Sequence, residues 1–307
     1  MENLQIENLE KLLEQKPDDL DIKRQLAFAY LDDGFLAKAL EKFQELVEVL
    51  PREGELYFNI GIIYEKMKDN ANAEIAYKKA MELSPDDADF IYNLAFLYDQ
   101  TGKHDLAVDL YKRVLILDER DGNSHFNLAC LYVKKNNSKS AINHFLKAIE
   151  CNSEDAYAHF YLAYEYKKSG EKQKAKEHYN KVVKINPEYG WAYYNLACMC
   201  LEENNPEQAL ECIEKTLKTN PRDIEAYKTL ASIYISMGEI TAGIMRIEEA
   251  LEQNPDFYDL YCILAAMYLK NKDRQKAILH YKTALSNTDC LTIPAETIKK
   301  ELNRLTK

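Results

Sequence analysis

Residues 88–121 read ADFIYNLAFLYDQTGKHDLAVDLYKRVLILDERD, and this stretch predicts two helices joined by a short turn. Four residues at i, i+3, i+4 and i+7 share one face of the first helix: Ile91, Leu94, Ala95 and Tyr98. Gly102 is expected to end that helix, because glycine readily takes the left-handed conformation found there. A second helical stripe then follows: Leu106, Ala107, Leu110, Tyr111, Val114 and Leu117.

The pattern recurs with a period of 34 residues. Proline keeps this phase at six places: Pro17, Pro51, Pro85, Pro187, Pro221 and Pro255. A column of small residues keeps it throughout: Ala27, Gly61, Ala95, Ala129, Ala163, Ala197, Ala231 and Ala265. A period of this length indicates a stacked array of helix pairs, in which small residues let paired helices approach closely. We therefore expect function to reside in a long surface rather than in one reaction site.

The chain resembles the tetratricopeptide repeat (TPR) family in several segments, among them YNLAFLYDQTGKHDLAVDLYKRVL, YLAYEYKKSGEKQKAKEHYNKVVKINP and YNLACMCLEENNPEQALECIEKTLKTNP. The resemblance implies an all-α fold, a right-handed superhelical α-solenoid of helix-turn-helix repeats. It covers residues 20–291 as eight repeats: 20–53, 54–87, 88–121, 122–155, 156–189, 190–223, 224–257 and 258–291. The turn glycine is replaced in four of them, by Lys68, Asn136, Asn204 and Lys272.

Both ends are expected to form capping helices, within residues 1–19 and 292–307. The first has an apolar face made of Ile6, Leu9, Leu12 and Leu13. The last follows Pro294 and has an apolar face made of Ile298, Leu302 and Leu305. Such helices cover the exposed core of terminal repeats. For the last helix, docking into a partner is the alternative.

The composition limits the kinds of partner that the chain is expected to bind. The net charge of −11 disfavours nucleic acid, because an acidic chain repels phosphates. No secretory signal and no membrane-spanning stretch is evident, and the seven scattered cysteines are typical of a reducing compartment, so we expect a cytoplasmic protein without membrane contact. His125 and His159 recur one period apart, as do His144 and His178, and we expect them to fill repeat columns. No metal site and no cofactor are predicted.

A second stripe lies beside the core stripe of each first helix, and it is rich in aromatic residues. Its main column contains Phe58, Tyr92, Phe126, Phe160 and Tyr194. The resemblance to TPR proteins implies that this stripe lies on the concave face. The candidate peptide-binding residues are Tyr92, Asn93, Phe96, Phe126, Asn127, Tyr157, Phe160, Tyr161, Tyr164, Trp191, Tyr194 and Asn195. The asparagines can pair with a peptide backbone. The alternative is that these residues only pack between repeats.

These observations favour a non-catalytic scaffold or adaptor that binds an extended or helical apolar segment of a protein in the groove of repeats 3–6. The alternative is a self-associating structural protein, a homo-oligomer held by charge asymmetry. Residues 1–121 carry a net charge of −12 and residues 256–307 one of +3, so such contacts would run head to tail. An enzyme is not expected, since the sequence has no nucleophile triad, catalytic carboxylate pair or phosphate-binding loop.

Overall fold

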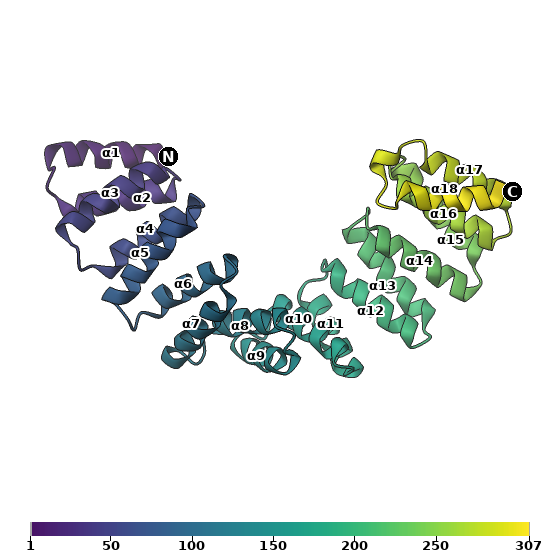
Figure 1. Cartoon of the computed structure of the whole chain (residues 1–307), viewed down its shortest axis with the longest axis horizontal. Coiled ribbons are helices and arrows are strands. Elements are labelled where there is room, and N and C mark those ends of the chain that lie inside the picture. Colours follow the sequence, from purple (N-terminus) through teal and green to yellow (C-terminus); the bar gives the residue numbers. More distant parts are fainter. Residues whose placement is uncertain (1, 307) are drawn as a thin grey trace. The chain divides into compact units, whose positions relative to one another are not determined.

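The computed structural model describes residues 2–306, and nearly all regular structure in that range is α-helical (Figure 1). The helices alternate between two roles after a leading helix α1 (Glu2–Gln15). The first helices of the pairs are α2 (Leu20–Asp32), α4 (Gly54–Lys66), α6 (Ala88–Gln100), α8 (Gly122–Lys134), α10 (Ala156–Lys168), α12 (Gly190–Glu202), α14 (Ile224–Met237) and α16 (Tyr258–Lys270). The second helices are α3 (Leu36–Val49), α5 (Asn70–Leu83), α7 (His104–Leu117), α9 (Ser138–Cys151), α11 (Lys172–Ile185), α13 (Pro206–Thr219), α15 (Ile240–Gln253) and α17 (Arg274–Ala284). A short 3-10 turn (Thr288–Cys290) leads to the last helix, α18 (Ala295–Thr306).

The turn inside each pair is set by one left-handed residue. Glycine takes this conformation at Gly34, Gly102, Gly170 and Gly238, as predicted for Gly102. The four replacements have positive φ as well: Lys68, Asn136, Asn204 and Lys272. Lysine has a Cβ that crowds this conformation, so the fold imposes it there against the local preference.

Acidic residues start most first helices. Asp87, for example, accepts hydrogen bonds from the backbone N–H groups of Asp89 at 3.1 Å and Phe90 at 3.2 Å. Such a cap satisfies donors that the helix itself leaves unpaired. Tyr189 and Phe257 stand at this position before α12 and α16, and neither provides a side-chain cap.

The two predicted core stripes meet inside each pair. The first stripe of residues 88–121 is buried as expected, and so are Ala107, Tyr111 and Val114 of the second. Leu106 and Leu117 were placed in that stripe wrongly, because they lie at its edges and are 49% and 41% exposed. The small column is needed for contact: a Cβ on Gly61 would lie 2.5 Å from the ring of Tyr77.

The chain divides into two compact units, Met1–Ser153 and Glu154–Lys307, each with its own buried core. In the first unit α1 packs on α2 and buries Ile6 and Leu9, whereas Leu12, expected on the same face, is 44% exposed. In the second unit α18 packs on α17 and buries Ile298. None of the helices within residues 2–306 has the length and apolarity needed to cross a bilayer.

Candidate functional site

The second stripe of the first unit is largely packed. The ring of Tyr92 on α6 lies edge-on to Tyr111 of α7, with centroids 5.5 Å apart, and burial raises its pKa. Phe126 on α8 lies edge-on to Phe145 of α9 at 5.7 Å. Phe96 is also only partly exposed. The aromatic residues predicted to bind a ligand in this unit are therefore half-buried against second helices.

The second unit presents its aromatic residues to solvent. Four of them form what we call the exposed aromatic patch: Tyr157 (62% exposed), Tyr161 (39%), Tyr164 (48%) and Trp191 (61%). Three lie on α10, and Trp191 lies in the first turn of α12. Phe160 and Tyr194, which continue the main column here, are half-buried. Several exposed rings close together, unlike a single one, mark a surface that a partner can cover.

A layer of rings supports this patch from below. Phe160 contacts Tyr161 at a centroid distance of 5.7 Å and Tyr179 of α11 at 5.6 Å. Tyr189, just before α12, contacts Phe160 at 5.1 Å and Tyr157 at 5.8 Å. Burial raises the pKa of Tyr189 to about 12, and Tyr161 and Tyr157 add to this shift. These contacts fix the orientation of two patch residues before any ligand arrives.

The side-chain amides of the three candidate asparagines already make hydrogen bonds within the chain. The side-chain N–H of Asn93 donates to the carbonyl of Asp89 at 2.8 Å, and that of Asn195 donates to the carbonyl of Trp191 at 2.9 Å. Asn127 donates to the Tyr92 hydroxyl at 2.9 Å. Each amide has a second N–H, so one donor per residue is left over from these bonds. The column therefore offers a peptide fewer groups than the sequence alone suggests.

Two residues that support the exposed aromatic patch were not predicted from the sequence. The ammonium of Lys167 on α10 donates to the side-chain oxygen of Asn195 on α12 at 3.2 Å, which ties the two patch helices together. Tyr189 replaces the acidic cap found before most first helices. That break in a mostly acidic column, shared only with Phe257, was the available signal, whereas the contact of Lys167 depends on how the helices pack.

Family profiles described as tetratricopeptide repeat match four sets of residues: 168–233, 54–87 with 122–155, 76–109 with 144–177, and 228–289. The chain belongs to the tetratricopeptide repeat family. The helix pairs, the left-handed turns and the small columns described above are those of a TPR solenoid. No curated protein sequence matches this TPR chain.

Solved structures share the fold. YrrB, described as a TPR protein with an unusual peptide-binding site, is 24% identical, with 61% of this chain and 97% of YrrB covered at a TM-score of 0.54. MamA is 24% identical, with 54% and 97% covered at 0.51. PilF of Pseudomonas aeruginosa is 16% identical, with 66% and 92% covered at 0.55. At such identities the similarity concerns the fold of this TPR chain alone.

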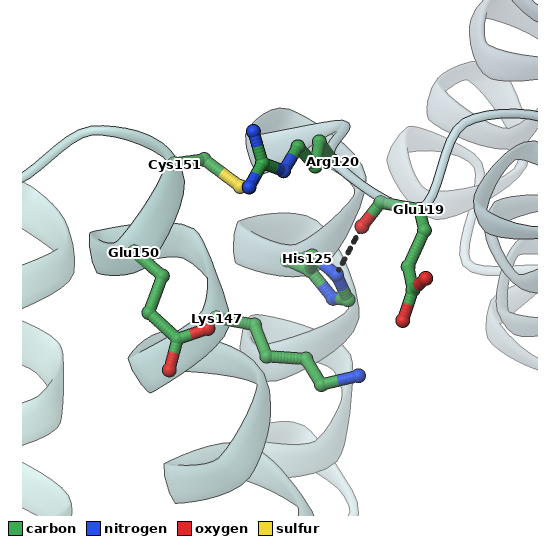
Figure 2. A pocket seen from close by; sticks show the side chains of 6 residues that line it. All are labelled: Glu119, Arg120, His125, Lys147, Glu150 and Cys151. Atoms are coloured by element: carbon green, nitrogen blue, oxygen red, sulfur yellow. Dashed lines mark hydrogen bonds between the residues drawn. The ribbon is translucent and has the colours of Figure 1, made fainter.

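Each unit of the TPR chain also has hollows outside the exposed aromatic patch. In the second unit, a cavity of about 390 Å³ lies between α14, α16 and α18, with Ile235, Ile263 and Ile298 in its apolar lining and Lys270 also lining it. In the first unit, a cavity of about 450 Å³ is lined by residues of both charges: Glu119, Arg120, His125, Lys147, Glu150 and Cys151. Figure 2 shows Arg120 extended toward the thiol of Cys151.

Metal-ligand sets and reactive thiols would indicate chemistry among the described residues of the TPR chain. Within residues 2–306, no three His, Cys, Asp or Glu side chains form a group suited to a metal ion. Burial raises the pKa of the thiols of Cys130 and Cys262 to about 12 and that of Cys212 to about 11. These three thiols stay protonated at neutral pH and are poor nucleophiles.

Proposed function

We propose that this TPR chain is a non-catalytic interaction scaffold, and that its exposed aromatic patch binds an extended or helical apolar segment of a partner protein. One observation carries the proposal: four large rings on α10 and α12 remain 39–62% exposed, although the same helices bury their core stripes. Aromatic anchors supply much of the energy in protein interfaces. Phe160 and Tyr189 already fix the orientation of two of these rings, Tyr161 and Tyr157, which lowers the entropy cost of binding.

The surroundings of the patch suit a peptide backbone. Asn195 and Lys167 lie between the two patch helices and offer N–H donors to peptide carbonyl groups. YrrB, which shares the fold, is described as having a peptide-binding site, and this supports the same class of ligand here. In the first unit, Tyr92, Asn93, Phe96, Phe126 and Asn127 have a smaller role in the proposal, since they are half-buried.

The test uses the single tryptophan of the chain, Trp191. Peptides are selected from a random display library on the full chain, and the strongest binder is synthesised and titrated while Trp191 fluorescence is followed. We expect saturable binding, a change in Trp191 emission, and at least about tenfold weaker binding by the Tyr161→Ala/Tyr164→Ala variant, measured with a labelled peptide.

Met245→Ala is the matched control, because Met245 is a 57% exposed apolar residue on the second helix α15. Its affinity should equal that of the wild type. A selected peptide that binds without changing Trp191 emission, and equally well to the Tyr161→Ala/Tyr164→Ala variant, would refute this site.

A further inference from the structure

Two histidine pairs occupy equivalent places in successive repeats. Nδ1 of His125 on α8 lies 2.9 Å from Nδ1 of His144 on α9. One repeat later, Nδ1 of His159 on α10 lies 2.8 Å from Nδ1 of His178 on α11. In all eight repeats, histidine occupies both facing columns only in these two. The first-helix column is Lys23, Tyr57, Ile91, His125, His159, Tyr193, Tyr227 and Tyr261. The second-helix column is Lys42, Ala76, Leu110, His144, His178, Cys212, Arg246 and His280.

The proton positions of the first pair follow from its neighbours. Nε2 of His125 lies 3.2 Å from the carbonyl oxygen of Glu119, the contact drawn in Figure 2. A carbonyl only accepts, so Nε2 carries the proton and Nδ1 of the neutral ring is an acceptor. The hydrogen bond between the rings is therefore donated by Nδ1–H of His144. His125 is 2% exposed, whereas His144 is half-buried under the ring of Tyr132, which stacks on it at 5.5 Å.

This arrangement tolerates one added proton but not two. The first can go to Nε2 of His144 and leaves the bond between the rings intact. The second must go to Nδ1 of His125, the acceptor of that bond. Two N–H groups and two positive charges then face each other across 2.9 Å. The pair cannot stay closed in this form, because like charges repel strongly where water is largely excluded.

The charged residues around the pairs do not compensate for this repulsion. For the first pair, Lys112 on α7 and Lys147 on α9 oppose protonation, while Glu119 and Asp121 before α8 favour it. Near His178, Glu177 favours protonation and Lys181 opposes it. Burial is the largest cause that lowers the pKa of His125, and it lowers the pKa of His144 and of His178 to about 4. His144 and His178, one ring of each pair, are thus neutral at pH 7.

We propose that the two histidine pairs are an acid-sensitive latch that holds α8 to α9 and α10 to α11 while neutral and releases each helix pair when both of its rings take up a proton. The proton suits this site better than a metal ion, because within residues 2–306 neither pair is joined by a third His, Cys, Asp or Glu ligand. His280 shows the contrast: it faces the ring of Tyr261, not a second histidine, at 6.1 Å.

The sign of the effect is fixed. His144 and His178 bind their protons near the ordinary pKa of 6.5 in the unfolded chain and only at a pKa of about 4 in the folded chain. The latch therefore contributes its full stability above pH 6.5 and loses it as the pH falls toward 4. A comparison of pH 7.5 with pH 5 isolates the histidines, since most carboxylates stay ionised above about pH 5.

The test measures melting temperatures of the full chain at the two pH values. The His144→Asn/His178→Asn variant keeps a side-chain amide at both positions, with an N–H donor toward His125, but removes one titrating ring from each pair. We expect the wild type to lose at least about 5 °C between pH 7.5 and 5, and the variant less than half of that loss. His280→Asn is the matched control and should keep most of the wild-type loss. Equal losses in the wild type and the double variant would overturn the proposal.

Two measurements on the wild type guard against a variant that fails to fold. NMR titration of the histidine rings should show His144 and His178 still neutral at pH 5.5, and ordinary titration near 6.5 would overturn the proposal. Zn²⁺ added at pH 7.5 should leave the melting temperature unchanged. A saturable rise that the double variant lacks would assign the pairs to a metal ion instead.

Discussion

The second stripe is packed in one unit and open in the other. In Met1–Ser153, Tyr92 and Phe126 rest edge-on against rings of the second helices. In Glu154–Lys307, Phe160 does the same, but Tyr157, Tyr164 and Trp191 stand free of the core. The main column is aromatic in both units, so the difference comes from the neighbouring positions.

One neighbouring column shows where the difference arises. At the second position of the first helices it reads Asp21, Glu55, Asp89, Asn123, Tyr157, Trp191, Glu225 and Asp259. Where this position is polar, as at Glu55, Asp89 and Asn123, it adds no ring beside the main column. Tyr157 and Trp191 add a second layer of rings, which the core cannot cover because the first layer already fills it. The main column thus supports the fold in both units, and the exposed apolar surface arises where the neighbouring column is aromatic as well.

The largest expected effect tests a second contrast between the units. In the first unit one core column is apolar, with Ile63, Leu97 and Leu131 buried. In the second unit, Met199, Ile233 and Met267 continue this column as buried apolar residues, but Glu165 interrupts it. Glu165 is 0% exposed and has no hydrogen-bond partner for either carboxylate oxygen among the described residues. Glu165→Leu should raise the free energy of unfolding by about 3 kcal/mol in urea denaturation, because it removes an uncompensated buried carboxylate.

Glu165→Gln is the control for that substitution. It removes the charge but keeps two polar groups in an apolar column, so it should recover only part of the gain. A Glu165→Leu chain less stable than the wild type would show that the carboxylate makes a favourable interaction of its own, and the contrast between the units would not hold.

The next prediction compares the stability lost when a packed ring is removed with that lost when an exposed ring is removed. Tyr92→Ala removes a half-buried ring that contacts Tyr111 and a hydroxyl that accepts a hydrogen bond from Asn127. It should therefore lower the free energy of unfolding by about 2 kcal/mol. Trp191→Ala removes a 61% exposed ring and should change stability by less than about 0.5 kcal/mol. Urea denaturation of both variants measures the difference. Equal losses would mean that Trp191 is part of the packing and not of an open surface.

The fold could be predicted from the sequence because its determinants are local and repeated. The small columns, the core stripes and Gly102 each state a requirement of helix pairing, and eight copies of the pattern reinforce one another. The errors fell on Leu106, Leu117 and Leu12, at the edges of apolar faces. Spacing fixes the direction in which a side chain points, but its exposure also depends on how far the neighbouring helix extends.

The candidate site was predictable only as a set of residues. Tyr161, Tyr164 and Trp191 stood out as aromatic residues in unusual columns, whereas for Tyr92 and Phe126 the sequence left ligand binding and packing between repeats equally open. Their half-burial depends on contacts with rings 19 residues further along the chain. The histidine pairs show the same limit. Their period was visible, whereas the facing nitrogen atoms follow from the rotation of two helices about their axes.

A smaller effect concerns how the end helix of the second unit is held. Asp259 is 1% exposed and accepts hydrogen bonds from the backbone N–H of Thr292 at 3.0 Å and of Ile293 at 3.2 Å, just before α18. Asp259→Ala leaves these donors without their acceptor and should cost about 1.5 kcal/mol. Amide exchange at Thr292 and Ile293 should accelerate, while the exposed aromatic patch keeps its peptide affinity. Unchanged exchange would show that α17 alone holds the end helix.

The smallest effect should be the same in both units, which makes it a reference for the other contrasts. Lys68 in the first unit and Lys272 in the second have φ values of 62° and 63°, where glycine occupies four equivalent turns. Lys68→Gly and Lys272→Gly should each raise the free energy of unfolding by about 1 kcal/mol, because the Cβ strain is relieved at a partial cost in unfolded-chain entropy. Asn136→Gly should gain less, since asparagine tolerates this conformation. Urea denaturation of the three variants tests this order. If the gain in stability depends on the residue replaced and not on the unit in which it lies, the turns are set locally. The two units would then differ only in the residues on their helix faces.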